Sequence, residues 1–144
     1  MDFSLTDDQE LIRAAVAKVC ADYPDEYWAE RDQNHDFPWD FYNAMANAGW
    51  IGTAIPEAYG GSGMGITEAS LVLEEVAASG AAMNGATPLH LSMFGMEPVV
   101  KYGSEEMKQM YLPRVAAGEM HVAFGVTEPD AGTDTTSITT AAKR

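Results

Sequence analysis

Cysteine is almost missing from this sequence, since Cys20 is the only one among 144 residues. A single thiol cannot form a disulfide within the chain, so the sequence suits a reducing compartment. Cys20 lies among apolar residues of an expected helix, which favours a small buried side chain over a nucleophile. The chain starts with neither a secretory signal nor an Arg-rich organellar presequence, so we expect a cytoplasmic location.

Basic residues and long hydrophobic runs are also scarce. Eight Lys and Arg residues stand against 22 Asp and Glu residues, which gives a formal net charge of −14 at pH 7. Such a charge repels phosphate backbones and anionic lipids, so it argues against nucleic acids and membranes as partners. No apolar stretch approaches the roughly 20 residues that span a bilayer. The 47% of hydrophobic residues is nevertheless enough for one buried core.

Helical periodicity dominates most of the chain. Thr6 and Gln9 form a capping-box pattern in front of a helix expected at 7–20. The apolar stripe of that helix is expected to comprise Leu11, Ala15, Val16 and Val19. Further helices are expected at about 25–32, 38–49, 67–78, 89–102 and 105–118. Residues 50–55 are either a short strand or a buried connector.

The period of the sequence changes to two after residue 118. Met120, Val122, Phe124 and Val126 alternate with other residues, which predicts a strand over 120–127 with one buried face. Enrichment in Thr and Ile predicts a second strand over 135–142. Two strands alone make a marginal sheet, so we expect the chain to stop part-way through a β-domain. We therefore predict a mainly α fold, with an all-α domain over 1–118 and the start of a β-domain over 119–144.

Several residues invite functional interpretations that their spacing does not support. The glycines from Gly60 to Gly65 break the Gly-x-Gly-x-x-Gly spacing of dinucleotide-binding loops, so we expect a tight surface loop. His35, His90 and His121 share no metal-ligand spacing. His90 either faces a ligand cavity or makes an ordinary local hydrogen bond. Likewise, the nine methionines are either adaptable core residues or the wall of a cavity for a flexible ligand.

The stretch 124–134 carries most of the functional information; it reads Phe-Gly-Val-Thr-Glu-Pro-Asp-Ala-Gly-Thr-Asp. Thr127 would end a strand with its hydroxyl and backbone N–H pointing outward, and Gly132 and Thr133 offer backbone donors that a ligand can approach closely. This arrangement suits an oxygen-rich anion. A plain β-turn decorated with Thr and Asp has the same composition, so the residues alone leave both interpretations open.

This stretch closely resembles the flavin-binding signature of the acyl-CoA dehydrogenase family. Matching segments occur in the same order along the chain. They are Phe3-Ser4-Leu5-Thr6 with Gln9, Pro56-Glu57-Ala58-Tyr59-Gly60-Gly61 with Gly63, and Tyr102-Gly103-Ser104-Glu105-Glu106-Met107-Lys108 with Tyr111-Leu112-Pro113. The resemblance implies an α-helical amino-terminal domain, a β-barrel-like middle domain and a carboxy-terminal four-helix bundle, which agrees with the change from helical to strand period.

The resemblance also implies FAD as the cofactor and assigns residues to its site. Thr127, with Val126 beside it, matches the position that supplies donors to flavin N1 and the neighbouring carbonyl. Phe124 stands where the family often has a Tyr against the flavin. Gly132 and Thr133 match the pyrophosphate contacts, and Thr133 is also implied to lie near the pantetheine arm of the substrate.

The implied reaction removes a proton from Cα of an acyl-CoA thioester and passes the Cβ hydride to flavin N5, leaving a trans-2-enoyl-CoA. Family members take the general base from a glutamate of the carboxy-terminal bundle. That residue would lie beyond Arg144, so this chain alone is expected not to turn over. Glu128 is expected to order the loop rather than act as the base. The implied partners are an electron-transfer flavoprotein and further copies of the enzyme in a dimer or tetramer.

Two other functions stay open on the sequence. A flavin monooxygenase or a nitroalkane-oxidising relative would share the fold and the flavin signature. A non-catalytic helical subunit would instead complete the flavin site of a partner protein. Reduction of the flavin by an acyl-CoA separates the first alternative from a dehydrogenase, and association with a partner tests the second.

Overall fold

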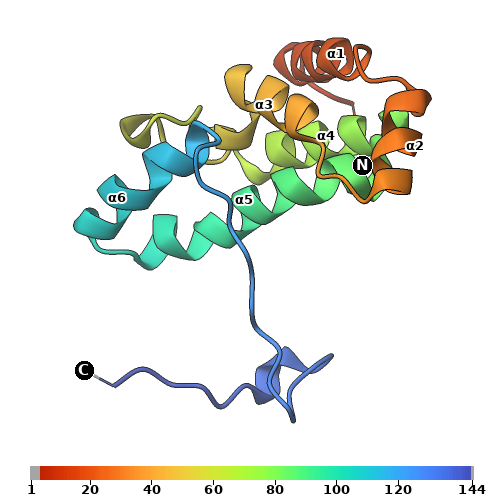
Figure 1. Cartoon of the computed structure of the whole chain (residues 1–144). Coiled ribbons are helices and arrows are strands. Elements are labelled where there is room, and N and C mark those ends of the chain that lie inside the picture. The colour runs from red at the N-terminus through yellow and green to blue at the C-terminus, as the bar shows by residue number, and fades with distance from the viewer. Residues whose placement is uncertain (1–3, 144) are drawn as a thin grey trace.

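The computed structural model describes residues 4–143, so Phe3 of the first family segment lies outside the described residues. The α-helices are α1 (Asp7–Cys20), α2 (Asp25–Asn34), α3 (Trp39–Asn47), α4 (Ile66–Val76), α5 (Ala82–Tyr102) and α6 (Glu105–Ala116). Shorter turns are η1 (Trp50–Gly52), η2 (Glu57–Tyr59), the π-helical η3 (Ala77–Ala81) and η4 (Thr135–Ser137). The helices gather into one body, and the chain leaves this body after α6 (Figure 1). The predicted mainly α fold is confirmed.

The predicted caps of two helices are present. The Thr6 side chain accepts a hydrogen bond from the Gln9 N–H (3.3 Å), and the Thr6 N–H donates to Gln9 Oε1 (3.1 Å), which completes the capping box of α1. The hydroxyl of Ser104 accepts from the Met107 N–H (3.2 Å) at the start of α6. Local sequence alone therefore determines where these helices begin.

The predicted apolar stripe of α1 was right only in part, since Val16 is buried and Val19 is half-buried but Leu11 and Ala15 are exposed. Leu11 is 67% exposed, whereas Ile12, Val16 and Cys20 are buried. Residues four apart lie on one face of a helix, so these three side chains point together into the core, and α1 packs against α4. The burial of Cys20 agrees with the small buried side chain expected for it, and burial raises the pKa of its thiol.

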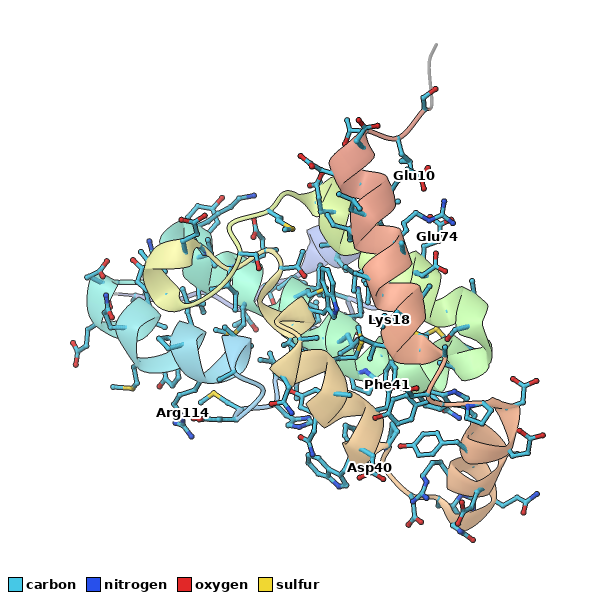
Figure 2. All side chains as sticks on the ribbon, turned by 90° about the horizontal axis from the view of Figure 1, so that it is seen from above. Glu10, Lys18, Asp40, Phe41, Glu74 and Arg114 are labelled. Carbon is cyan, nitrogen blue, oxygen red and sulfur yellow. The ribbon has the colours of Figure 1, made fainter. Side chains whose placement is uncertain are left out.

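An aromatic cluster fills the junction of α1, α2 and α3. Phe41 makes edge contacts with Trp28 (ring centroids 5.0 Å apart) and Tyr23 (5.3 Å), and Figure 2 shows it inside the body, with the charged Asp40 and Lys18 on the outside. Such edge-to-face pairs stabilise a core beyond the area that they bury. They fix α2, a largely polar helix, against its neighbours.

Helix α5 is the central element of the body. It contacts α3, α4, α6 and η1, and its Leu89, Met93 and Met96 are buried. The helix begins at Ala82, earlier than the predicted start at residue 89, and continues through Pro88. A proline inside a helix costs roughly 3 kcal/mol. Gly85 at the same end is buried and packs closely against α2, since an added Cβ there would lie 3.1 Å from the Trp28 ring.

The segment between α3 and α4 is a buried connector followed by a tight loop. Residues 50–52 form the 3-10 turn η1, and Ile51, Thr53 and Ile55 are buried, so the strand alternative was wrong. The glycine-rich loop is the predicted surface turn. Gly61 must lack a side chain, because an added Cβ would lie 2.0 Å from the Ile55 carbonyl oxygen. Gly60 adopts a φ of 82°, which glycine tolerates without strain.

The two strands predicted after residue 118 do not form among residues 4–143. One isolated antiparallel bridge joins Glu128 and Ala131. The predicted alternation of burial survives in part, since Val122 and Val126 are half-buried while Phe124 is 48% exposed. A strand requires a second strand to pair its N–H and C=O groups, and no neighbouring segment supplies one here. The division into domains at 118/119 stays a prediction.

None of the helices within residues 4–143 combines the length and the apolar character that a membrane crossing requires.

Candidate functional site

An open cavity of about 730 Å³ lies between α4, α5 and the connector that precedes α4. Its walls are largely apolar. Their larger side chains are Met64, Ile66, Leu73, Met93, Phe94 and Val100. A mostly apolar hollow of this size with a few polar groups is the usual form of a small-molecule site.

The polar groups of this cavity lie along two helices. The Glu97 carboxylate binds the Lys101 ammonium at 2.8 Å, and this hydrogen bond raises the pKa of Lys101. The pair is partly exposed, so it contributes little to stability. The Ser70 hydroxyl donates to the Ile66 carbonyl oxygen (2.8 Å). The imidazole of His90 also lines the cavity.

Phe124, the first residue of the flavin signature, contacts the wall of this cavity. Its ring meets the ring of Phe94 edge-on, with centroids 4.8 Å apart. On its other side, Phe94 stacks with His90, with centroids 5.4 Å apart and ring planes 9° apart. The stretch 124–134 therefore begins next to the cavity, although the two are far apart in the sequence.

The residues just before Phe124 hold the chain against the helical body. A Cβ added to Gly95 would lie 2.5 Å from Val122 Cγ1, so a glycine in α5 is what lets Val122 approach the helix. His121 stacks on Tyr42, with centroids 4.3 Å apart, and also makes an edge contact with Trp39 at 5.1 Å. These contacts fix the point from which the flavin signature leaves the body.

His90 and His121 lie in different surroundings, since His90 stacks on Phe94 and His121 stacks on Tyr42. Within the part of the chain that the structure describes, no group of three His, Cys, Asp or Glu side chains could hold a metal ion.

A tight turn follows Thr127. The Glu128 N–H donates to the Ala131 carbonyl oxygen (3.1 Å), and the Ala131 N–H donates to the Glu128 carbonyl oxygen (3.2 Å). Thr127 and Gly132 flank this reciprocally bonded pair, so the turn brings the chain before Glu128 and the chain after Ala131 close to each other. Ala131 is 1% exposed, whereas Thr127 and Gly132 are both exposed.

The Glu128 side chain ties this turn to the segment that follows η4. Its carboxylate accepts hydrogen bonds from the backbone N–H groups of Thr139 (2.9 Å) and Thr140 (2.8 Å) and from both of their hydroxyls. Donation from the Thr139 backbone and from Thr140 lowers the pKa of Glu128 from 4.5 to about 2. Glu128 therefore orders the loop, as expected from the sequence.

The backbone donors of the signature are available for a ligand. The N–H groups of Thr127, Gly132 and Thr133 donate to no other group of the described chain. A Cβ added to Gly132 would have no atom within 4 Å, so a bulky group has room to approach. Free N–H groups on a turn form a concave site for an anion, so these residues fit the phosphates of a dinucleotide. Val126 is half-buried beside Thr127.

A second cavity, of about 500 Å³, lies between the end of α2 and the start of α5. Arg31 lines it and is paired with Asp36 at 3.7 Å. Residues 124–134 line neither cavity, but Phe124 contacts Phe94 in the wall of the first one, so we assign the functional site to the first cavity.

Phe94 was missed in the sequence analysis as a residue of the site. His90 and Phe94 are four positions apart, which places two ring side chains on one face of a helix. That spacing is the feature of the sequence that could have indicated a pair of contacting rings. What the sequence could not indicate is that Phe124 would lie against this face.

Comparison with known proteins places the chain in a family. Residues 6–119 match the family described as "Acyl-CoA dehydrogenase, N-terminal domain". The chain belongs to the acyl-CoA dehydrogenase family. It is 34% identical to acyl-CoA dehydrogenase FadE12 of Mycobacterium tuberculosis, over 99% of this chain and 36% of the relative. It is 37% identical to acryloyl-CoA reductase (NADH) of Anaerotignum propionicum, again over 99% of this chain and 36% of the relative.

Solved structures show the same fold. The structure of the glutaryl-coenzyme A dehydrogenase glutaryl-CoA complex aligns with a TM-score of 0.84 at 32% identity, over 96% of this chain and 35% of that one. The structure of PigA with FAD and proline aligns with a TM-score of 0.82 at 25% identity, over 93% and 35%. This chain thus spans a little over a third of the proteins it matches, and the activity of a whole protein is a matter of proposal.

Proposed function

We propose that this chain forms part of the FAD and acyl-CoA site of an acyl-CoA dehydrogenase, which converts an acyl-CoA thioester to the trans-2-enoyl-CoA. The contact between Phe124 and Phe94 carries the proposal, because it joins the flavin signature to an apolar cavity. A related structure is a complex with glutaryl-CoA, which supports an acyl-CoA as the substrate.

FAD is the cofactor that we propose. Two related structures are described as containing FAD, PigA with FAD and proline and an acyl-CoA dehydrogenase of Bacillus anthracis that is 26% identical to this chain. Thr127 and Val126 would hold the isoalloxazine beside Phe124, and Gly132 and Thr133 would hold the pyrophosphate. When bound, the flavin supplies the hydride acceptor that the dehydrogenation requires.

The residues of this chain would then position the substrate and exclude water. Met93 and Phe94 line the cavity with apolar surface for the acyl chain. The hydroxyl and N–H of Thr127 would stabilise negative charge as it develops next to them. Thr133 would lie near the pantetheine arm. Preorganised donors of this kind require no rearrangement during the reaction.

We assign the proton abstraction to a residue outside this chain. Glu97 lines the cavity, but its carboxylate is paired with Lys101. Glu128 is bound by four donors from Thr139 and Thr140, which keep it a weak base. A glutamate beyond Arg144 therefore remains our proposed general base, and the 144 residues alone are not expected to turn over.

The proposed partners follow from the same assignment. They are an electron-transfer flavoprotein as the electron acceptor and further copies of the enzyme in a dimer or tetramer. A cytoplasmic location is proposed from the single cysteine, whose side chain is buried and free.

Two alternatives have support among the relatives. PigA was solved with FAD and proline, so a protein of this fold can hold FAD together with a small molecule that is not an acyl-CoA, which supports an oxidase or monooxygenase as the second candidate. The ChsE4–ChsE5 complex, with a TM-score of 0.72 and 29% identity, is an assembly of two components. It supports the third possibility, a subunit that completes the flavin site of a partner.

The test is to add acyl-CoA thioesters of increasing length, without oxygen, to the complete polypeptide that contains this chain, loaded with FAD. The proposal predicts that at least one thioester bleaches the flavin absorbance, because hydride transfer reduces the ring. Bleaching by an amino acid but by no thioester would favour the oxidase alternative. If no thioester bleaches the flavin and flavin binding requires a second protein, the subunit alternative replaces the proposal.

A further inference from the structure

His90 lies one turn before Phe94 on the cavity face of α5. The two rings stack with planes 9° apart, and both line the cavity. Four residues of helix separate them, which corresponds to about 6 Å along the helix axis. Phe94 also contacts Phe124, where the flavin signature begins. An acyl chain that extends from the flavin past Phe94 along α5 towards its amino-terminal end would therefore meet His90 next.

His90 is the polar side chain of this cavity for which no hydrogen bond is found among the described residues, although its neighbours Ser70, Glu97 and Lys101 each make one. The Ser70 hydroxyl already donates to the Ile66 carbonyl oxygen, and Glu97 and Lys101 are paired with each other. The imidazole nitrogens of His90 bond to no other described residue, and its exposed ring stacks on Phe94. One ring nitrogen is a donor, and the other is an acceptor in the neutral ring.

This arrangement favours one kind of acyl group over another. His90 is exposed among the described residues, and a plain alkyl chain that buried its ring nitrogens would remove their water without replacing it, which costs a polar group roughly 1–3 kcal/mol. An acyl chain with an oxygen at that depth restores the hydrogen bond. A site built to bond a polar substituent discriminates strongly against the analogue that lacks it.

We propose that His90 determines specificity, and that the acyl group of the natural substrate carries an oxygen substituent, a hydroxyl, keto or carboxylate group, that hydrogen-bonds to His90. This inference rests on the function proposed above. It adds the chemical class of the substrate and assigns its recognition to a residue outside the flavin signature.

The experiment compares thioesters of equal chain length, one ending in a methyl group, one carrying a hydroxyl, one a keto group and one a terminal carboxylate. The dissociation constant of each is measured by calorimetry on the complete polypeptide whose FAD has been chemically reduced beforehand, so that no hydride is transferred, and bleaching of the oxidised flavin is followed separately. At least one oxygenated thioester should bind roughly tenfold more tightly than the methyl-ended one, which corresponds to about 1.4 kcal/mol. Comparing the thioester that carries a carboxylate with the one that carries a hydroxyl shows whether the site prefers a charged or a neutral substituent.

The matched variants are His90→Phe and Ser70→Ala. His90→Phe keeps a ring that can stack on Phe94 but removes both nitrogens. The preference for the oxygenated thioester should therefore disappear, and the methyl-ended thioester should bind at least as tightly as it does to the unsubstituted protein. Ser70→Ala changes a neighbouring cavity residue whose hydroxyl proton is donated to the Ile66 carbonyl oxygen, so the preference should remain. Calorimetry on the same variants shows binding independently of turnover.

Equal binding of all the thioesters to the unsubstituted protein would overturn the inference, and so would a preference that survives in His90→Phe. In both cases, bleaching by the methyl-ended thioester would leave the proposed dehydrogenase function standing. If no thioester of either kind binds or bleaches the flavin, the proposed function itself is wrong, and the assignment of His90 falls with it.

Discussion

At the scale of single residues, Glu128 shows how one carboxylate orders a turn that the backbone alone closes with two hydrogen bonds. Its oxygens accept from the backbone and side chains of Thr139 and Thr140, more than ten residues further along the chain. These bonds require the ionised carboxylate. They keep the donors of the flavin signature on a turn of defined shape.

Protonation of Glu128 should weaken its hydrogen bonds to Thr139 and Thr140. Because the pKa of Glu128 is lowered from 4.5 to about 2, these hydrogen bonds are fully present above pH 4.5 and are lost as the pH falls through about 2. The amide shifts of Thr139 and Thr140 in an NMR titration measure this directly. Glu128→Gln should shift both amides at neutral pH and abolish their titration. A midpoint near 4.5 in the unsubstituted protein would mean that the carboxylate is not bound in this way.

Gly95 is a second residue with a local structural effect, because its lack of a side chain lets Val122 pack against α5. Gly95→Ala would place a Cβ 2.5 Å from Val122 Cγ1, and overpacking of this kind costs about 1–3 kcal/mol. The gain in helix propensity, roughly 0.5–1 kcal/mol, offsets part of that cost. Urea denaturation of the single and double variants measures the balance. Val122→Ala should cost less in the Gly95→Ala background than alone, and strictly additive costs would contradict the contact.

At the scale of elements, the helices whose ends depend on local chemistry were the ones predicted best. The predicted range of α1 agrees with Asp7–Cys20, and Ser104 caps α6 as expected. Thr6→Ala should destabilise the protein by about 1 kcal/mol in urea denaturation, whereas Thr6→Ser should be close to neutral, because serine can also accept from the Gln9 N–H. Equal stability of all three proteins would show that the capping box contributes nothing.

The elements predicted badly are those that depend on contacts distant in sequence. The start of α5 was placed too late, because the helix continues through Pro88 and its first turns pack against residues distant in sequence such as Trp28. The predicted strands did not form for a similar reason, because alternation of apolar residues does not specify a second strand with which the segment can pair. The flavin-signature residues were found through family resemblance, but their connection to the cavity through Phe94 required the fold.

At the scale of the whole molecule, the chain carries a formal net charge of −14 at pH 7. Repulsion among like charges destabilises the compact state, and the four ion pairs found within residues 4–143 involve partly exposed side chains. Moderate concentrations of sodium chloride should therefore raise the thermal unfolding midpoint by screening this repulsion. A midpoint that falls as salt is added would show that the ion pairs outweigh the repulsion.

The central claim is that the turn from Val126 to Thr133 holds a flavin dinucleotide beside the cavity of α4 and α5. The most direct measurement is a titration of FAD into the apo form of the complete polypeptide, followed by quenching of flavin fluorescence. We predict saturable binding that Thr127→Val weakens roughly tenfold, in line with the loss of one hydrogen bond of about 1.4 kcal/mol. A protein that stays colourless and does not quench FAD, with or without Thr127→Val, would contradict the account.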